Sequence, residues 1–217
     1  MNSDITKTLL LMLIICLAPV FAVAAPPDVP STISEEAKKA AATLVLDQEN
    51  RAPGPNDIEG WESYWKQAAE GEEEAGMKIV EKLGATVEKL ELGGVPVLDI
   101  KPKSWKDNGK VLVYTHGGAY TLFSASTTLS SSVPVADLTG LRIISVDYTV
   151  APHQKWEATT SQVVSVIKAL IGEGYGLKDI AIFGDSAGGG MAAGSVLKAR
   201  DEGVGLVAAV VLWSPWS

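Results

Sequence analysis

A serine flanked by glycines is the residue of this sequence best placed to do chemistry. Ser186 stands in the pentapeptide Gly184-Asp185-Ser186-Ala187-Gly188, which follows an apolar run at residues 180–183 and precedes a helix-like run that begins near Gly189. In a nucleophile elbow, a sharp strand-to-helix turn exposes the serine hydroxyl, and glycines two positions to either side relieve the crowding. We therefore expect Ser186 to be a nucleophile, with Gly184, Asp185 and Gly188 supporting the turn.

A second motif, His116-Gly117-Gly118-Ala119, follows another apolar run at residues 110–115. Hydrolysis of an ester by serine passes through a tetrahedral oxyanion, and each backbone N–H group that stabilises it contributes about 3 kcal/mol to lowering the barrier. The amides of Gly117, Gly118 and Ala187 are the candidate donors. Taken alone, the motif is typical of an ordinary glycine turn. Its combination with the serine motif favours an oxyanion hole.

These motifs and their order resemble the hormone-sensitive-lipase-like branch of the α/β-hydrolases, which includes bacterial esterases and epsilon-lactone hydrolases. The resemblance covers roughly residue 87 to the end and rests on four segments, at residues 116–120, 147–152, 184–189 and 212–216. It implies that Ser186 is the nucleophile of a small ester or lactone hydrolase. It also implies that Gly117, Gly118 and Ala187 form the oxyanion hole, and that His116 organises the loop with Ala119.

The same resemblance implies an acidic residue and then a histidine after the serine, and no histidine follows Ser186. A serine hydroxyl is a poor nucleophile unless an imidazole takes its proton. We therefore expect a hydrolase chain that stops before its catalytic acid and base. The alternative is an inactive truncated fragment or a ligand-binding pseudoenzyme. His153 as a replacement base, and a second chain that supplies the missing groups, are further alternatives; Asp201 and Glu202 are expected to be a solvated helix end.

The distribution of apolar runs predicts a doubly wound, mostly parallel α/β sheet that is incomplete on its C-terminal side. A hairpin is expected at residues 87–100 around Gly93-Gly94, followed by continuous apolar strands at residues 111–114, 141–146, 180–183 and 206–213. Helices are expected at residues 159–171 and 189–200. The strand at residues 206–212 is predicted to form an exposed apolar edge through which the protein self-associates and becomes poorly soluble.

The first part of the chain predicts export and a helical cap. Residues 1–24 combine a lysine, an apolar run and a small-residue cleavage site, as in a signal peptide. A periplasmic or extracellular location follows, without a membrane span after cleavage; an uncleaved anchor is the alternative. Residues 25–85 are expected to form a linker and the cap, with helical segments at residues 34–45 and 57–84. Trp61, Tyr64 and Trp65 either fill the contact with the core or line the substrate site. Residues 86–217 are the hydrolase core.

Composition excludes several other classes of protein. A net charge of −8 argues against nucleic-acid binding, which depends on clustered lysine and arginine. Two separated histidines and one cysteine, which lies in the predicted leader, provide no metal-ligand set. No phosphate-binding loop accompanies the glycines, because no Gly-Lys-Ser or Gly-Lys-Thr sequence follows them. We therefore expect neither a metal nor a cofactor.

Overall fold

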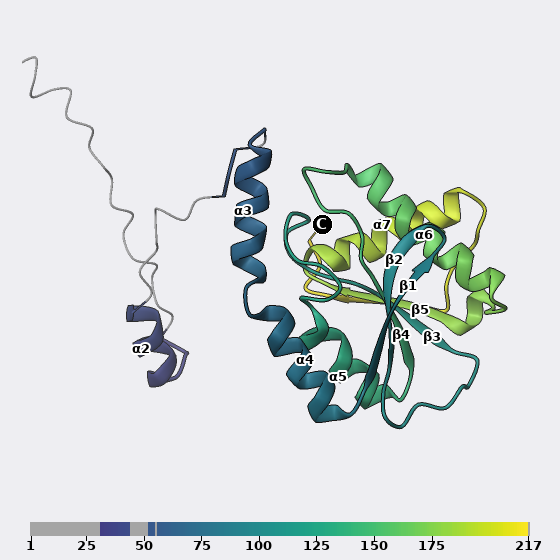
Figure 1. Cartoon of the computed structure of the whole chain (residues 1–217), viewed down its shortest axis with the longest axis horizontal. Helices are drawn as coiled ribbons and strands as arrows, with labels where there is room; N and C mark the ends of the chain where they lie inside the picture. The colour runs from purple at the N-terminus through teal and green to yellow at the C-terminus, as the bar shows by residue number, and fades with distance from the viewer. Residues whose placement is uncertain (1–30, 44–51, 55, 217) are drawn as a thin grey trace, which may run out of the picture. The chain divides into compact units, whose positions relative to one another are not determined.

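The computed structural model describes residues 31–43, 52–54 and 56–216 (Figure 1). The predicted leader at residues 1–24 and the linker at residues 25–30 lie outside the described residues. Residues 1–50 and 51–217 form two separate units. In the first unit, helix α2 spans Glu35–Thr43, and the Oγ of Ser34 accepts a hydrogen bond of 3.2 Å from the amide of Ala37. The predicted helix at residues 34–45 is therefore confirmed as far as Thr43.

The second unit is built on a six-stranded sheet with the order β1-β2-β4-β3-β5-β6. The strands are β1 Thr86–Leu92, β2 Val95–Lys101, β3 Val111–Thr115, β4 Arg142–Val146, β5 Ile180–Asp185 and β6 Ala209–Trp213. Strands β4, β3, β5 and β6 are parallel, whereas β1 and β2 join them in antiparallel pairing. The predicted doubly wound, mostly parallel α/β fold is thereby confirmed.

The hairpin between β1 and β2 turns at the predicted glycine pair. Leu92 pairs with Val95, so only Gly93 and Gly94 form the loop, and their φ angles are 60° and 77°. A two-residue turn with positive φ at both positions matches the right-handed twist of the strands and favours glycine. A Cβ on Gly93 would also lie 2.6 Å from the carbonyl oxygen of Ser165 in α6, so the turn packs closely against that helix.

Two pairs of helices pack on the sheet, each pair through one apolar cluster (Figure 1). The helices of this unit are α3 Ile58–Ala69, α4 Glu72–Leu83, α5 Leu129–Thr139, α6 Trp156–Gly172 and α7 Ala187–Asp201. In one cluster, Val80 of α4 and Val133 of α5 pack with Ile143 of β4. In the other, Ile167 of α6 and Met191 of α7 pack with strands β3, β4 and β5. The four strands β2, β4, β3 and β5 are therefore largely buried on both faces, as continuous apolar strands require, whereas the outer strands β1 and β6 are mostly exposed.

The predicted helical region at residues 57–84 is two helices. They meet at Glu70 and Gly71, where the φ of Gly71 is 79° and both residues are exposed. Helix α5 was not predicted from the sequence. Within the described residues, no helix is both long enough and apolar enough to span a bilayer.

The predicted last strand is β6, which begins at Ala209 and not at residue 206. Within the described residues β6 is the last strand of the sheet, and it pairs only with β5. The exposed fractions of Val210, Val211 and Leu212 are 40%, 46% and 40%. Self-association through this edge stays a prediction.

Candidate active site

Ser186 occupies a strained turn between β5 and α7. Its φ and ψ angles are 52° and −122°, and a positive φ at a residue other than glycine carries a conformational free energy of about 1–3 kcal/mol. A Cβ on Gly184 would lie 2.3 Å from the carbonyl oxygen of Gly188, and one on Gly188 would lie 2.0 Å from that of Thr115. The turn therefore has no room for a side chain two positions to either side of Ser186.

The elbow is held by hydrogen bonds from the two strands that flank β5. The Oγ of Thr115, at the end of β3, donates to the carbonyl of Gly188 at 2.8 Å. On the other side, the amide of Ser186 donates to the carbonyl of Trp213 at 2.8 Å, and the amide of Trp216 donates to the carbonyl of Ser186 at 2.9 Å. These bonds fix the strained backbone of Ser186 between two neighbouring strands.

The loop after β3 brings the other predicted residues to the elbow. A Cβ on Gly117 would lie 2.4 Å from Oδ2 of Asp185, so the loop contacts the residue before the serine. Gly118 has a φ of 114°, and positive φ angles of 54° and 60° follow at Ala119 and Tyr120. Clusters of such outliers are typical of functional sites, because they persist only where the surroundings enforce them.

The three predicted oxyanion donors are free to bind an acceptor. In the described part of the chain, no hydrogen bond uses the amide of Gly117, Gly118 or Ala187. Ala187 is the first residue of α7, where backbone N–H groups have no partner within the helix and where the helix dipole favours negative charge. The amides are therefore suited to a developing oxyanion.

His116 is completely buried and faces inward beside this loop. Its ring stacks on that of Tyr148 with centroids 4.1 Å apart, and Nδ1 lies 2.7 Å from the carbonyl oxygen of Gly117. A carbonyl can only accept, so Nδ1 carries a proton. Burial lowers the pKa of His116, which keeps the ring neutral and leaves Nε2 unprotonated. The geometry supports the organising role that the resemblance implies, since the ring fixes the backbone of Gly117.

Asp185 is bonded beneath the elbow by a residue that sequence reasoning missed. The hydroxyl of Tyr114 in β3 donates to Oδ1 of Asp185 at 2.6 Å. Burial and, second, the neighbouring carboxylate raise the pKa of Tyr114, so its hydroxyl stays protonated and a permanent donor. The only signal in the sequence is the hydroxyl group of this tyrosine near the end of an otherwise apolar strand.

The remaining ionisable candidates share no hydrogen bond with Ser186 in the described structure. The ring of His153 packs against that of Trp65, with centroids 4.8 Å apart, and lines a cavity of about 520 Å³ between α3 and the segment after β4. Neither His116 nor His153 shares a hydrogen bond with Ser186 in the part of the chain that the structure describes. Asp201 and Glu202 are exposed and paired with lysine and arginine side chains, which confirms the solvated helix end.

The predicted aromatic residues of the first helices divide between two environments. Trp61 packs edge-on against Tyr64 with centroids 5.9 Å apart, and its Nε1 donates to the carbonyl of Gly54 at 3.0 Å. Trp65 instead lines the cavity that contains His153. Trp61 and Tyr64 therefore pack on each other within α3 and belong to neither apolar core cluster, whereas Trp65 is a candidate for contact with a ligand.

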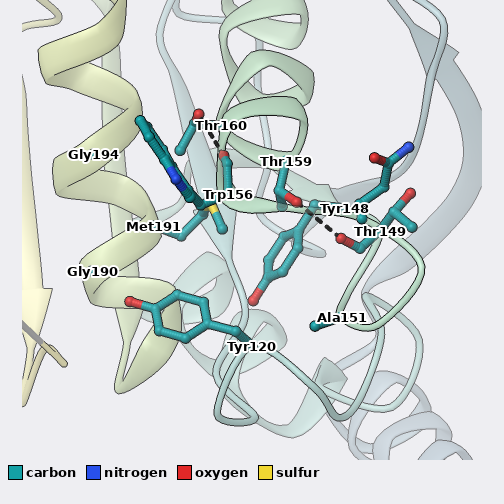
Figure 2. A pocket seen from close by; sticks show the side chains of 11 residues that line it. Tyr120, Tyr148, Thr149, Ala151, Trp156, Thr159, Thr160, Gly190, Met191 and Gly194 are labelled. Carbon is teal, nitrogen blue, oxygen red and sulfur yellow. Dashed lines mark hydrogen bonds between the residues drawn. The ribbon is translucent and has the colours of Figure 1, made fainter. Parts of the chain in front are cut away.

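A second cavity, of about 340 Å³, lies beside the elbow between α6 and α7 (Figure 2). Tyr120 of the glycine loop and Gly190 of α7 line one end of the cavity, and Trp156, Met191 and Gly194 are among the residues that line the remainder. Sequence reasoning missed these residues. The signal that could have found them is the spacing of Gly190, Met191 and Gly194, which places them on one side of α7.

The fold is that of an α/β protein with a parallel sheet enclosed by helices, and comparison with known proteins shows which proteins it resembles. Residues 112–217 match a family described as having the alpha/beta hydrolase fold. The chain is 34% identical, over 134 residues, to LipR of Mycobacterium tuberculosis, to which acetyl-hydrolase activity is ascribed. This match covers 62% of the chain and 43% of LipR, so the chain spans less than half the length of this curated relative.

Two solved structures carry the same fold. The crystal structure of an esterase named E25 matches 88% of this chain and 60% of its own, with a TM-score of 0.70 and 25% identity. A hormone-sensitive lipase from a metagenome library matches 70% of this chain and 50% of its own, with a TM-score of 0.63 and 30% identity. The resemblance to the hormone-sensitive-lipase-like branch of the α/β-hydrolases is therefore confirmed.

Proposed function

We propose that this protein carries the nucleophile and oxyanion hole of a serine carboxylic-ester hydrolase that acts on small esters or lactones. The observation that carries the proposal is the strained turn of Ser186 next to the unengaged amides of Gly117, Gly118 and Ala187. The similarity to proteins named acetyl-hydrolase and esterase supports the same class of reaction. Because the chain spans only part of these relatives, the activity is a proposal for the protein and not a property carried over from them.

In the proposed reaction, Ser186 Oγ attacks the carbonyl carbon of the ester and transfers its proton to a base. The carbonyl oxygen becomes an oxyanion that accepts hydrogen bonds from the three amides. Collapse of this intermediate breaks the bond to the alcohol oxygen, which leaves with a proton, and the acyl group stays on Ser186. Water then attacks the acyl-serine through a second oxyanion, and the acid is released while Ser186 Oγ regains its proton.

The base is the part of the mechanism that the described residues do not supply directly. Nδ1 of His116 already donates to the carbonyl of Gly117, and the ring of His153 packs on Trp65. A second candidate function follows from these two contacts: the chain binds esters or acids at the same site without turning them over. The two candidates predict the same ligands and differ only in whether Ser186 becomes acylated.

Burst kinetics separate these functions. The purified protein is mixed with p-nitrophenyl acetate or p-nitrophenyl butyrate, and release of p-nitrophenol is followed for the protein and for Ser186→Ala. Ser195→Ala is the matched control, because Ser195 is a buried serine of the same helix whose Oγ has no hydrogen-bond partner in the described structure. Hydrolysis predicts release that Ser186→Ala abolishes and Ser195→Ala retains. Equal release by all three proteins would overturn the proposal in favour of binding alone.

A further inference from the structure

We infer that Tyr148 is a positioning residue of the proposed oxyanion hole, because its hydroxyl fixes the direction of the Gly117 N–H group. The inference rests on the proposed function, since the direction of this donor matters to a reaction only if an oxyanion forms beside Ser186. Tyr148 acts on that reaction only through the carbonyl of His116, to which its hydroxyl donates a hydrogen bond.

The carbonyl of His116 and the N–H of Gly117 belong to one peptide unit, and its peptide bond is trans. A trans peptide is planar, so the two groups point in opposite directions and turn together. Outside the strand ladders, no other hydrogen bond of the described residues ends on the carbonyl of His116, which is a completely buried residue. The bond from Tyr148 therefore sets the plane of this peptide unit.

His116 holds the next peptide unit in the same way. Its Nδ1 lies 2.7 Å from the carbonyl oxygen of Gly117, and that carbonyl shares a peptide unit with the N–H of Gly118. The rings of His116 and Tyr148 are nearly parallel, with centroids 4.1 Å apart and an angle of 6° between their planes. Two stacked rings thus fix two successive peptide units, and each unit carries one of the predicted oxyanion donors.

The position of Tyr148 is itself fixed by the residues on either side of it. Strands β3 and β4 are parallel neighbours, so the segments that follow them leave the same edge of the sheet. Oδ1 of Asp147 accepts a hydrogen bond of 2.8 Å from the amide of Ala125. The amide of Thr149 donates to Oε1 of Gln162 at 2.9 Å. Tyr148, which is 3% exposed, therefore holds its acceptor in a preorganised position, as stabilisation of an oxyanion requires.

Tyr148 remains a hydrogen-bond donor over the ordinary pH range. A carbonyl can only accept, so the hydrogen of this bond comes from the phenol. Burial, as the main cause, raises the pKa of Tyr148, so the hydroxyl stays protonated. The Tyr148→Phe variant removes the donor and retains the ring that stacks on His116. The buried carbonyl is then free to turn, and the N–H of Gly117 turns with it.

Isotope labelling isolates the peptide unit that Tyr148 holds. His116-Gly117 is the only His-Gly pair in the sequence, so ¹³C at the histidine carbonyl and ¹⁵N in glycine give a single signal in a spectrum that correlates the two nuclei. The carbonyl shift reports the hydrogen bond, and the residual dipolar coupling of the N–H reports its direction. In Tyr148→Phe the carbonyl signal should move upfield and the coupling should change. The signals of the other glycines show whether the fold is intact.

The matched control is Tyr175→Phe, because it also removes one hydrogen-bonded phenol. The hydroxyl of Tyr175 accepts a hydrogen bond of 3.1 Å from Arg142, at the opposite end of β4 from Tyr148. In this variant the carbonyl shift of His116 and the dipolar coupling of Gly117 should equal those of the parent protein.

Burst kinetics with p-nitrophenyl butyrate test whether the direction of the donor matters to the reaction. Removal of one oxyanion donor lowers kcat by about 10²–10³, and a donor that is present but misdirected should cost less. Tyr148→Phe is therefore expected to lower the acylation rate constant about 10–100-fold. An interaction made only in the transition state leaves substrate binding unaltered, so KM should be unchanged. Tyr175→Phe should retain both values.

The outcomes separate the positioning role from the proposed function. If the carbonyl shift and the dipolar coupling are the same in Tyr148→Phe and the parent, the positioning role is wrong whatever Ser186 does. It is also wrong if both change while the acylation rate constant does not. If both change but release in the parent does not depend on Ser186, Tyr148 orients the Gly117 amide of a binding site, and the hydrolase proposal alone fails.

A second substitution keeps the test decisive if Tyr148→Phe does not fold. All five tyrosines are replaced biosynthetically by 3-fluorotyrosine, whose more acidic hydroxyl is a stronger donor. The carbonyl signal of His116 should then move downfield, and a signal that stays in place would overturn the inference.

Discussion

Replacing Gly188 with alanine tests whether the elbow is packed as closely as the structure indicates. The new Cβ would lie 2.0 Å from the carbonyl oxygen of Thr115 and 2.5 Å from the carbonyl carbon of His116, both backbone atoms of the neighbouring strand end. Relief requires a backbone shift of more than 1 Å in a packed core, which destabilises a protein by about 3 kcal/mol. Alanine returns about 1 kcal/mol through helix propensity. The net loss in unfolding free energy is about 2 kcal/mol.

For a unit of this size, a loss of 2 kcal/mol lowers the melting temperature by about 4–8 °C. Gly172→Ala is the matched control, because Gly172 is the last residue of α6 and a Cβ there meets no atom within 4 Å. Melting is followed by circular dichroism at 222 nm under identical conditions for both variants. A Gly188→Ala protein that melts within 1 °C of Gly172→Ala would refute the argument from close approach.

Three further changes test the charges and surfaces of the same unit. Arg142→Met leaves Asp99, which is 2% exposed, with only Lys101 at 3.1 Å, and urea unfolding should show a loss of about 3 kcal/mol; a loss below 1 kcal/mol contradicts the buried pair. Burial lowers the pKa of His116, so its contribution to stability is complete above pH 6.5 and is lost as the pH falls. Between pH 6.5 and 5.5, the unfolding free energy of the parent protein should therefore fall by up to about 1.4 kcal/mol per pH unit because of His116. His116→Asn should lack this contribution, and the same pH dependence in both proteins would count against the burial of a neutral His116. Val211→Lys should reduce the self-association expected of the exposed strand, as measured by light scattering, and a parent protein that is already a monodisperse monomer would disprove that expectation.

The fold was predictable where local chemistry and burial agree. Continuous apolar runs located the strands, and Gly93-Gly94 located the hairpin, because both signals are confined to a few neighbouring residues. Helix boundaries were less accurate. The predicted start near Gly189 is in fact Ala187, since Ser186 itself turns the chain directly from strand into helix.

Helix α5 was missed because its own sequence does not favour a helix. It contains Pro134 and three consecutive serines, and neither end of the helix is capped by a side-chain hydrogen bond. Leu129 and Val133 are completely buried or nearly so, and they pack with α4 and the sheet. Tertiary packing therefore decides the conformation of this segment, and single-sequence propensity does not report it.

The residues of the candidate site were predictable as motifs, but their connections were not. The glycine-flanked serine and the His-Gly-Gly loop are local patterns, whereas the bond from Tyr114 to Asp185 joins residues 71 positions apart. The cavity beside the elbow likewise combines residues from two helices and two loops. Contacts of this kind depend on the register of the sheet, which the sequence pattern alone does not determine.

The most direct test of the central claim is the position of the acyl group after reaction with p-nitrophenyl butyrate. The protein is quenched in acid within the burst, digested, and its peptides are analysed by mass spectrometry, with Ser186→Ala treated in parallel. The account predicts a butyryl group on the peptide that contains Ser186, and none on the corresponding peptide of the variant. A butyryl group found only on lysines or other serines, or at equal levels in both proteins, would contradict the account.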